Sequence, residues 1–213
     1  MHCIIFDFDG TIADTMPLCV EAFRQGLEPF VGRHLSDEEI LSTFGPSEEG
    51  SVRTVCPNHY EKGLQHCLDA YRRLHPAMCS KPFDGITELL QDIRKAGIPL
   101  ALVTGKGPLT LTISLEMLAM QDIFDAVETG SPHGGNKPEC MSKVLQRFKV
   151  DVNDAVYIGD MPSDILACRK IGIPIYAAAW AKTADAEKLN ALKPDKLVRS
   201  IQELRDLLAI PAK

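Results

Sequence analysis

The sequence predicts an α/β fold in which a parallel sheet forms the core and a helical cap domain is inserted after the first strand. Three observations support this prediction. The apolar run 3–8 is typical of a buried strand, residues 14–79 show helical periodicity without a convincing strand, and helix and strand signals alternate from about residue 80. Strands separated by helices indicate right-handed βαβ crossovers, so we expect the sheet to be covered on both faces.

The first strand ends in two carboxylates, Asp7 and Asp9, followed by Gly10 and Thr11. In open α/β folds the active site lies at the carboxyl ends of the strands. One carboxylate of such a pair can act as a nucleophile and the other as a general acid or base, provided that a cation relieves their repulsion. A turn Asp beside a helix-capping Asp is the alternative that this short segment leaves open.

The next segment, residues 14–79, is predicted to be a helical insertion. Apolar side chains share one helix face in 20–31, a capping box begins at Ser36, and a longer apolar stripe runs through 60–74. Because the segment leaves the core after the first strand and returns before the second, it must emerge above the carboxylates at the sheet edge. We predict a lid, with a helical layer that completes the core as the alternative.

The remaining chain is predicted to alternate regularly. A helix at 86–93 is expected to be capped by Asp84 and ended by Gly97. The expected elements that follow are strand 98–103, helix 108–120, strand 123–127, helix 138–148, strand 155–158, helix 165–171, strand 173–178, helix 184–192, strand 196–198 and helix 201–208. Residues 1–13 and 80–213 would thus form a Rossmann-like catalytic core, and residues 14–79 the cap.

The composition narrows the class of protein. The chain has 213 residues, 45% of them hydrophobic and 24% charged, which is ordinary for a globular protein. A net charge of -6 without a Lys/Arg cluster argues against nucleic acid or a membrane surface as the main partner. Without a long apolar stretch or a signal peptide, a cytoplasmic monomer is expected. The seven cysteines contain no Cys-x-x-Cys pair, so we expect reduced core thiols.

Polar residues follow three further strands. In a parallel sheet these strand ends lie at the same edge as Asp7 and Asp9, so we expect them to converge on one pocket. Each group alone also has a plainer interpretation, as a βα turn, a solvated lysine or an exposed helix residue. The groups are Thr104-Gly105-Lys106 after strand 98–103, Lys137 in the loop beyond strand 123–127, and Asp160 and Asp164 after strand 155–158.

This set of residues suits phosphoryl transfer. The Thr104 hydroxyl and the amides around Gly105 and Gly10 could donate hydrogen bonds to a phosphate, and Lys137 and Lys106 could supply positive charge. The four carboxylates outweigh the two lysines. At about 4 Å and an effective dielectric near 20, each uncompensated pair of like charges costs about 4 kcal/mol, so we expect a divalent cation. Ligands that offer only oxygen favour Mg²⁺.

The same ordered motifs resemble the haloacid-dehalogenase superfamily, on its phosphatase branch, over nearly the whole chain. The helical insertion is similar to that family's C1-type cap, as in phosphoglycolate phosphatases, pyrophosphatases and β-phosphoglucomutases. The resemblance implies that Asp7 attacks phosphorus and that Asp9 protonates the leaving oxygen and then activates water. It also implies that Thr104 and Lys137 hold the phosphoryl group. By the same resemblance, Mg²⁺ would be bound by the Asp7 carboxylate, the Asp9 carbonyl and Asp160, with Asp164 in support.

The cap says less about the substrate. Residues 45–50 form a turn-rich loop, and similar loops in relatives with this cap face the substrate, so Ser47 and Arg53 are candidates for contacts with the leaving group. A polar turn without a ligand role is the alternative.

The leading prediction is a Mg²⁺-dependent phosphomonoester hydrolase of small phosphorylated metabolites, similar to phosphoglycolate phosphatases. A β-phosphoglucomutase-type mutase and an inorganic pyrophosphatase would use the same residues. Outside enzymes, a receiver-like phospho-acceptor module and a silent interaction domain are the alternatives. A receiver would be shorter and would carry its modified Asp on an internal strand.

Overall fold

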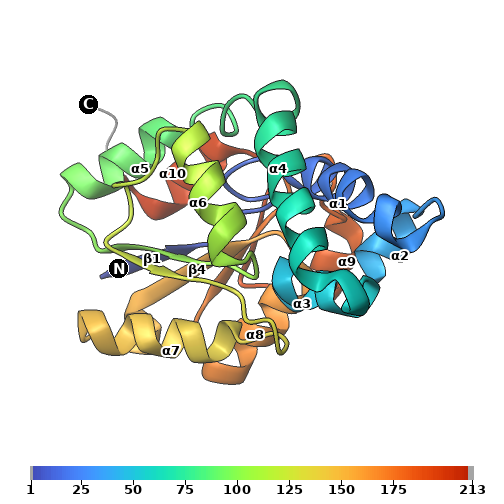
Figure 1. The fold of residues 1–213 in the computed structure, drawn as a ribbon. Helices are drawn as coiled ribbons and strands as arrows, with labels where there is room; N and C mark the ends of the chain where they lie inside the picture. The colour runs from blue at the N-terminus through green and yellow to red at the C-terminus, as the bar shows by residue number, and fades with distance from the viewer. Residues whose placement is uncertain (1, 211–213) are drawn as a thin grey trace.

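A parallel sheet of six strands forms the centre of the molecule, which a computed structural model describes for residues 2–210 (Figure 1). The strand order is β3-β2-β1-β4-β5-β6, so β1 lies in the middle of the sheet. The predicted α/β fold is confirmed. The strands are β1 Cys3–Phe6, β2 Leu100–Val103, β3 Ala126–Glu128, β4 Ala155–Gly159, β5 Ile175–Ala178 and β6 Lys196–Val198.

Helices cover both faces of the sheet. In Figure 1, α5 (Ile86–Lys95), α6 (Pro108–Met117) and α10 (Ile201–Leu208) lie on one side, with α7 (Lys137–Phe148) and α8 (Pro162–Ile171) on the other. β1 shows why both faces must be covered, because all four of its residues are buried. Alternate side chains of β1 enter different cores, with Ile4 and Phe6 on the α5 side and Cys3 and Ile5 on the α7 side.

Four α-helices lie between β1 and α5, gathered beyond one end of the sheet (Figure 1). They have an apolar cluster of their own that includes Phe23, Leu27 and Val52. Ala22 and Tyr71, however, belong to the core on the α5 side of the sheet, so the insertion and the core are packed together. The boundary of the cap at 14–79 stays a prediction. The helices are α1 Met16–Val31, α2 Asp37–Ser42, α3 Glu48–Val55 and α4 Tyr60–Met78, with a 3₁₀ turn at Pro57–His59.

Most element boundaries agree with the sequence prediction to within a few residues, and proline explains two of the differences. β2 begins after Pro99 and β5 after Pro174, two residues later than expected in each case. Proline has no N–H to donate to a neighbouring strand, so the ladder begins after it. α9 (Ala186–Ala191), the remaining helix, also lies within its predicted range. Every helix of residues 2–210 is too short or too polar to span a membrane.

The predicted cap of α5 is wrong. Gly85 holds the N-cap position in the left-handed conformation, with φ 88°, and makes no side-chain cap. The Asp84 carboxylate instead accepts a hydrogen bond from the Lys81 ammonium at 2.6 Å. A neighbouring cation therefore occupies the side chain that the sequence suggested as a cap.

Close packing of α1 on α4 gives a first prediction. A Cβ atom at Gly26 would lie 2.5 Å from the Cys67 sulfur and 2.7 Å from its backbone nitrogen. Gly26→Ala gains about 1 kcal/mol of helix propensity but overpacks a backbone contact, which typically costs about 1–3 kcal/mol. We expect a net loss of up to about 2 kcal/mol in the free energy of unfolding, measured by urea titration.

Gly63→Ala is the matched control, because it also replaces a helical glycine between these elements. The nearest atom to its Cβ would be the tip of the Leu27 side chain, at 3.1 Å, and the next two, of Cys56 and Val52, lie at ordinary contact distances of 3.5 and 3.6 Å. That tip can move, so we expect Gly63→Ala to stay within about 1 kcal/mol of the wild type. Equal losses in the two variants would show that the backbone contact of Gly26 is not the cause.

Candidate active site

Residues from the strand ends and from the helical insertion line one cavity of about 680 Å³. Asp7 follows β1, Thr104 follows β2 and Asp160 follows β4, as the parallel sheet requires. Of the predicted site residues, the cavity is lined by Asp7, Asp9, Thr104, Gly105, Lys106, Lys137 and Asp160.

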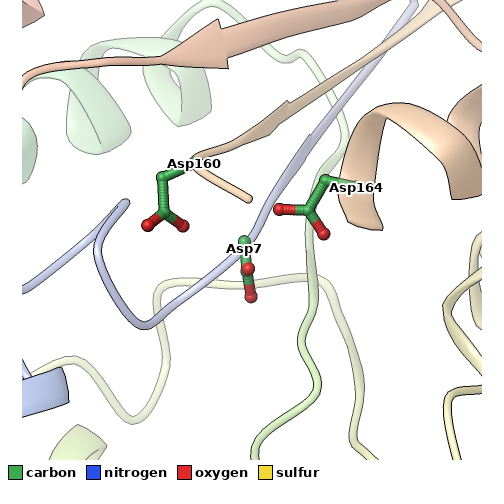
Figure 2. A group of neighbouring side chains, drawn as sticks. All are labelled: Asp7, Asp160 and Asp164. Carbon is green, nitrogen blue, oxygen red and sulfur yellow. The ribbon is translucent and has the colours of Figure 1, made fainter. Parts of the chain in front are cut away.

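Three buried carboxylates meet at the floor of this region. Figure 2 shows Asp7, Asp160 and Asp164 gathered at the end of β1, and one oxygen of each lies within 4.8 Å of the others. Asp160 accepts a hydrogen bond from the Thr11 hydroxyl at 3.2 Å. Asp164, in the first turn of α8, accepts the Met161 backbone N–H at 3.1 Å. The cluster is therefore fixed from several sides.

Two glycines make room for these carboxylates. A Cβ at Gly10 would lie 2.1 Å from an Asp160 oxygen, and one at Gly159 would lie 2.5 Å from an Asp164 oxygen. Gly10 also has a positive φ of 74°, which favours glycine. Its N–H donates to the Ala13 carbonyl at 2.8 Å. The predicted phosphate contact from the Gly10 amide is therefore not seen, because a local turn uses that donor.

The Lys137 ammonium bridges two of the three acids. It lies 2.6 Å from the Asp7 carboxylate and 2.5 Å from that of Asp164. Burial alone would lower the pKa of Lys137, but the Asp164 and Asp7 carboxylates raise it well above its usual value. Lys137 is thus a permanent cation at the predicted position.

One lysine does not balance the cluster. Burial raises the pKa of Asp7 to about 6; the Asp164 charge adds to the rise and Lys137 opposes it. Burial, followed by the charges of Asp7 and Asp164, raises the pKa of Asp160 to about 8. The ionised cluster therefore needs more positive charge than Lys137 supplies. A set of carboxylate oxygens this close fits Mg²⁺, which prefers oxygen ligands.

The Thr104 segment presents donors to the cavity. The buried Thr104 hydroxyl accepts the Lys106 backbone N–H at 3.2 Å, which leaves its own proton free to donate. Within residues 2–210, the backbone N–H groups of Asp9 and Gly105 donate to no protein acceptor. Both belong to the amides around Gly10 and Gly105 that the sequence suggested as phosphate donors, and that role stays a prediction.

Lys106 lies differently from the prediction. Its fully buried side chain reaches the Asp9 carboxylate at 3.0 Å and the Glu48 carboxylate at 3.3 Å. Its ammonium also lies 4.7 Å from the centre of the Tyr71 ring and 3.3 Å from the Cys19 sulfur. Lys106 is therefore held by two carboxylates, and its side chain has no exposed surface, whereas the Lys137 side chain is 14% exposed.

Glu48 is the residue that the sequence analysis missed. It is the first residue of α3 in the insertion, and its carboxylate accepts hydrogen bonds from the Gly107 N–H and the Thr110 hydroxyl. These donors belong to the start of α6, where a negative charge is favourable. Glu48 thus joins the insertion to the core, next to Lys106.

The two predicted cap contacts are not in the cavity. Ser47 is buried and its N–H donates to the Ser131 carbonyl at 2.9 Å. The Arg53 guanidinium stacks on the Tyr60 ring, 4.0 Å from its centre. A Cβ at the neighbouring Gly50 would lie 2.4 Å from the Pro132 carbonyl oxygen. The loop 45–50 therefore packs on the loop 130–136, and neither Ser47 nor Arg53 lines the cavity, although the buried Ser47 hydroxyl has no hydrogen-bond partner within residues 2–210.

Comparisons with known proteins agree with this arrangement. The model of the haloacid dehalogenase-like hydrolase family matches residues 4–178. The pyrophosphatase PpaX of Bacillus thuringiensis (strain Al Hakam) is 25% identical over 98% of this chain and 97% of its own. A haloacid dehalogenase-like hydrolase from Streptococcus pneumoniae superposes with a TM-score of 0.75 at 25% identity, covering 99% of both chains. A predicted phosphoglycolate phosphatase from Haemophilus somnus 129PT shares the fold, with a TM-score of 0.79 at 16% identity over 98% of both chains.

Magnesium is expected to stabilise the protein more at pH 8 than at pH 5.5. Burial raises the pKa of Asp160 in the folded protein from its ordinary value of 3.8 to about 8. The stability that this raised pKa contributes is present below pH 3.8 and is lost as the pH rises toward 8, so the metal-free protein weakens across that window. The affinity for a cation that binds the ionised acids rises over the same pH range, because more of the acids are ionised. Magnesium at about 100 times its Kd should add about 2.7 kcal/mol at pH 8, or about 5–10 °C in Tm.

Asp160→Asn tests the source of this effect. Without metal, the variant is expected to melt above the wild type at pH 8, because one uncompensated charge is gone, and its response to Mg²⁺ should shrink. Asp122→Asn, at an exposed carboxylate, is the control and should leave both quantities unchanged. Equal Mg²⁺ responses at the two pH values, or a full response in Asp160→Asn, would contradict the assignment of the metal site.

Proposed function

Because this chain belongs to the haloacid dehalogenase-like hydrolase family, we propose that it is a magnesium-dependent phosphatase that hydrolyses monoesters of small metabolites through an aspartyl phosphate. One observation carries the proposal. The Asp7 carboxylate lies in the cavity beside Lys137 and within the cluster of three acids. Few structural roles would justify burying so much unbalanced charge in one place.

Asp7 is the proposed nucleophile. One of its oxygens accepts the Phe8 N–H at 2.7 Å and the other contacts Lys137 at 2.6 Å, so the carboxylate has a fixed orientation. A fixed carboxylate can form a covalent phosphoryl intermediate without reorganising first. This orientation supports the role that the sequence suggested.

Asp9 is the proposed general acid and base. It is two residues beyond the nucleophile and lines the same cavity. Its carboxylate is held by the Thr15 hydroxyl and by Lys106 at 3.0 Å. A leaving alkoxide needs a proton, and the water that later attacks the aspartyl phosphate must lose one, so a positioned carboxyl group can serve both steps.

The remaining groups would bind the phosphoryl oxygens and the ion. Thr104, Lys137 and the free amides of Asp9 and Gly105 supply donors for the phosphoryl group. Mg²⁺ would be held by the Asp7 carboxylate, the Asp9 carbonyl and Asp160, with direct or water-mediated support from Asp164. When bound, the ion neutralises the charge that the acids and the phosphoryl group bring together.

We propose that residues 14–79 act as a lid. The contact between the loop 45–50 and the loop 130–136 supports this proposal, because it joins the insertion to the core beside the cavity and would break if the insertion moved. Closure would exclude bulk water and bring Glu48 to the start of α6.

Pyrophosphate hydrolysis is the second candidate, because the similar protein PpaX is named a pyrophosphatase. A mutase would use the same residues and differ only in protecting the aspartyl phosphate from water. The receiver-like module and the silent interaction domain are not favoured, since the family is one of hydrolases.

Asp7→Asn is expected to abolish phosphate release from every substrate, because the amide is a poor nucleophile. The assay is release of inorganic phosphate from sugar phosphates, phosphoglycolate, pyrophosphate and aryl phosphates, with and without Mg²⁺. Asp122→Asn is the control for the loss of one carboxylate at the surface. Near-normal turnover by Asp7→Asn would remove Asp7 as the nucleophile.

Asp9→Asn is expected to lose activity in a way that depends on the leaving group. For alkyl phosphates, whose alkoxide must be protonated, kcat for release of the alcohol should fall by about 10²–10⁴-fold. For p-nitrophenyl phosphate, whose leaving group needs no proton, the loss in the first burst of nitrophenol should be much smaller. Rapid-quench measurements of that burst separate the two steps, and equal losses for both esters would exclude the acid role.

A further inference from the structure

The cavity carries little positive charge beyond the place where the transferred phosphoryl group would bind. Within residues 2–210, its cationic lining side chains are Lys137 and Lys106. Lys137 contacts Asp7 and Asp164 at the phosphoryl end. Among the described lining residues, Lys106 is therefore the one cation that could meet the rest of the substrate.

Lys106 is already fully engaged. Its side chain has no exposed surface, and its ammonium is paired with both Asp9 and Glu48. The Tyr71 ring lies on another side of the ammonium. A second anionic group on a substrate could reach Lys106 only by displacing one of these carboxylates.

The insertion contributes negative charge and apolar surface to the same cavity. Glu48 is the one charged side chain among the lining residues that residues 14–79 supply. Leu41, Phe44 and Pro46 form the apolar wall beside it. Leu41 is 43% exposed, which is high for a leucine at the edge of a cavity and leaves it available to a ligand.

Two methionines add apolar surface to the lining. Met161, at the start of α8, lines the cavity and is 45% exposed. Met16 lines it from the start of α1. The polar groups nearby are partly used, because the Ser51 hydroxyl donates to the Thr43 carbonyl and the Asn136 amide to the Thr129 carbonyl. These two donors are therefore not available to a leaving group, and beyond Thr104 the remaining hydroxyl that residues 2–210 contribute to the lining is that of Ser163.

Building on the proposed phosphatase function, we propose that the substrate is a phosphomonoester of an uncharged alcohol with an apolar body. Its single phosphoryl group binds at Asp7 and Lys137, and its apolar part lies between Leu41, Phe44 and Met161. A carboxylate or second phosphate there would face Glu48 without a free cation. The inference therefore excludes pyrophosphate, phosphoglycolate and bisphosphates as preferred substrates, although similar proteins carry names of that kind.

Two esters that differ by one charge test the inference. Benzyl phosphate and 4-carboxybenzyl phosphate share the same ring and the same leaving oxygen, and 4-(hydroxymethyl)benzyl phosphate is the uncharged analogue of matched size. We expect kcat/KM with Mg²⁺ to be at least about 30-fold higher for benzyl phosphate than for the carboxylate, with the hydroxymethyl ester close to benzyl phosphate. Pyrophosphate and phosphoglycolate should be poorer than benzyl phosphate.

Two leucine-to-lysine variants, one at the cavity and one away from it, test the same inference. Leu41→Lys places a cation at the cavity, and it is expected to raise kcat/KM for the carboxylate ester relative to benzyl phosphate by at least about 10-fold. Leu109→Lys makes the same substitution at a leucine that is 46% exposed on α6 and does not line the cavity. It should leave the ratio of the two esters as in the wild type.

The outcomes separate this inference from the proposed function. Phosphate release that favours the carboxylate ester, phosphoglycolate or pyrophosphate would overturn the substrate class while supporting the phosphatase. Equal rates for the charged and uncharged esters would also overturn it, as would a Leu41→Lys ratio identical to that of Leu109→Lys. No release from any compound, with or without Mg²⁺, would overturn both proposals.

Discussion

The charge balance around Asp7 is the constraint on which the rest of the site depends. Three carboxylates lie within 4.8 Å of one another at the end of the central strand, and Lys137 reaches two of them. The supporting structure keeps them there against their repulsion. Thr11 holds Asp160, and the Trp180 indole donates to the Thr11 carbonyl at 3.1 Å. The acids follow β1, whose four residues are all buried and closely packed, so the end of this strand has little room to move.

The core of the site could be predicted because parallel strands impose it. Once β1, β2 and β4 are recognised, Asp7, Thr104 and Asp160 must come to the same edge. The cap contacts could not be predicted in this way. Which side chain of a loop faces the core depends on the exact start of the next helix. α3 begins at Glu48, which directs Glu48 to α6 and leaves Ser47 buried in the contact with Ser131.

Lysines at two similar-looking strand ends have different surroundings, and sequence alone did not separate them. Lys137 begins α7 and meets acids of the core, whereas Lys106 meets Asp9 and an acid 58 positions earlier in the chain, Glu48. A charge count along the sequence treats both as available to the substrate. In the folded protein, the acidic partners of each lysine decide whether it is available to the substrate. The residues that carry out the reaction also differ from those that select the substrate, so a family resemblance indicates the chemistry but not the substrate.

Glu48 ties the insertion to the catalytic centre through a short chain of contacts, from α6 to Lys106 and on to Asp9. A substitution of Glu48 would therefore affect the reaction, because it would remove one partner of the buried Lys106 next to Asp9. Leu41 and Pro46 line the same cavity without hydrogen bonds from their side chains, so they can change at little cost to the reaction. New specificities should accordingly arise from apolar cavity positions of the insertion, such as Leu41 and Pro46, before they arise from Glu48.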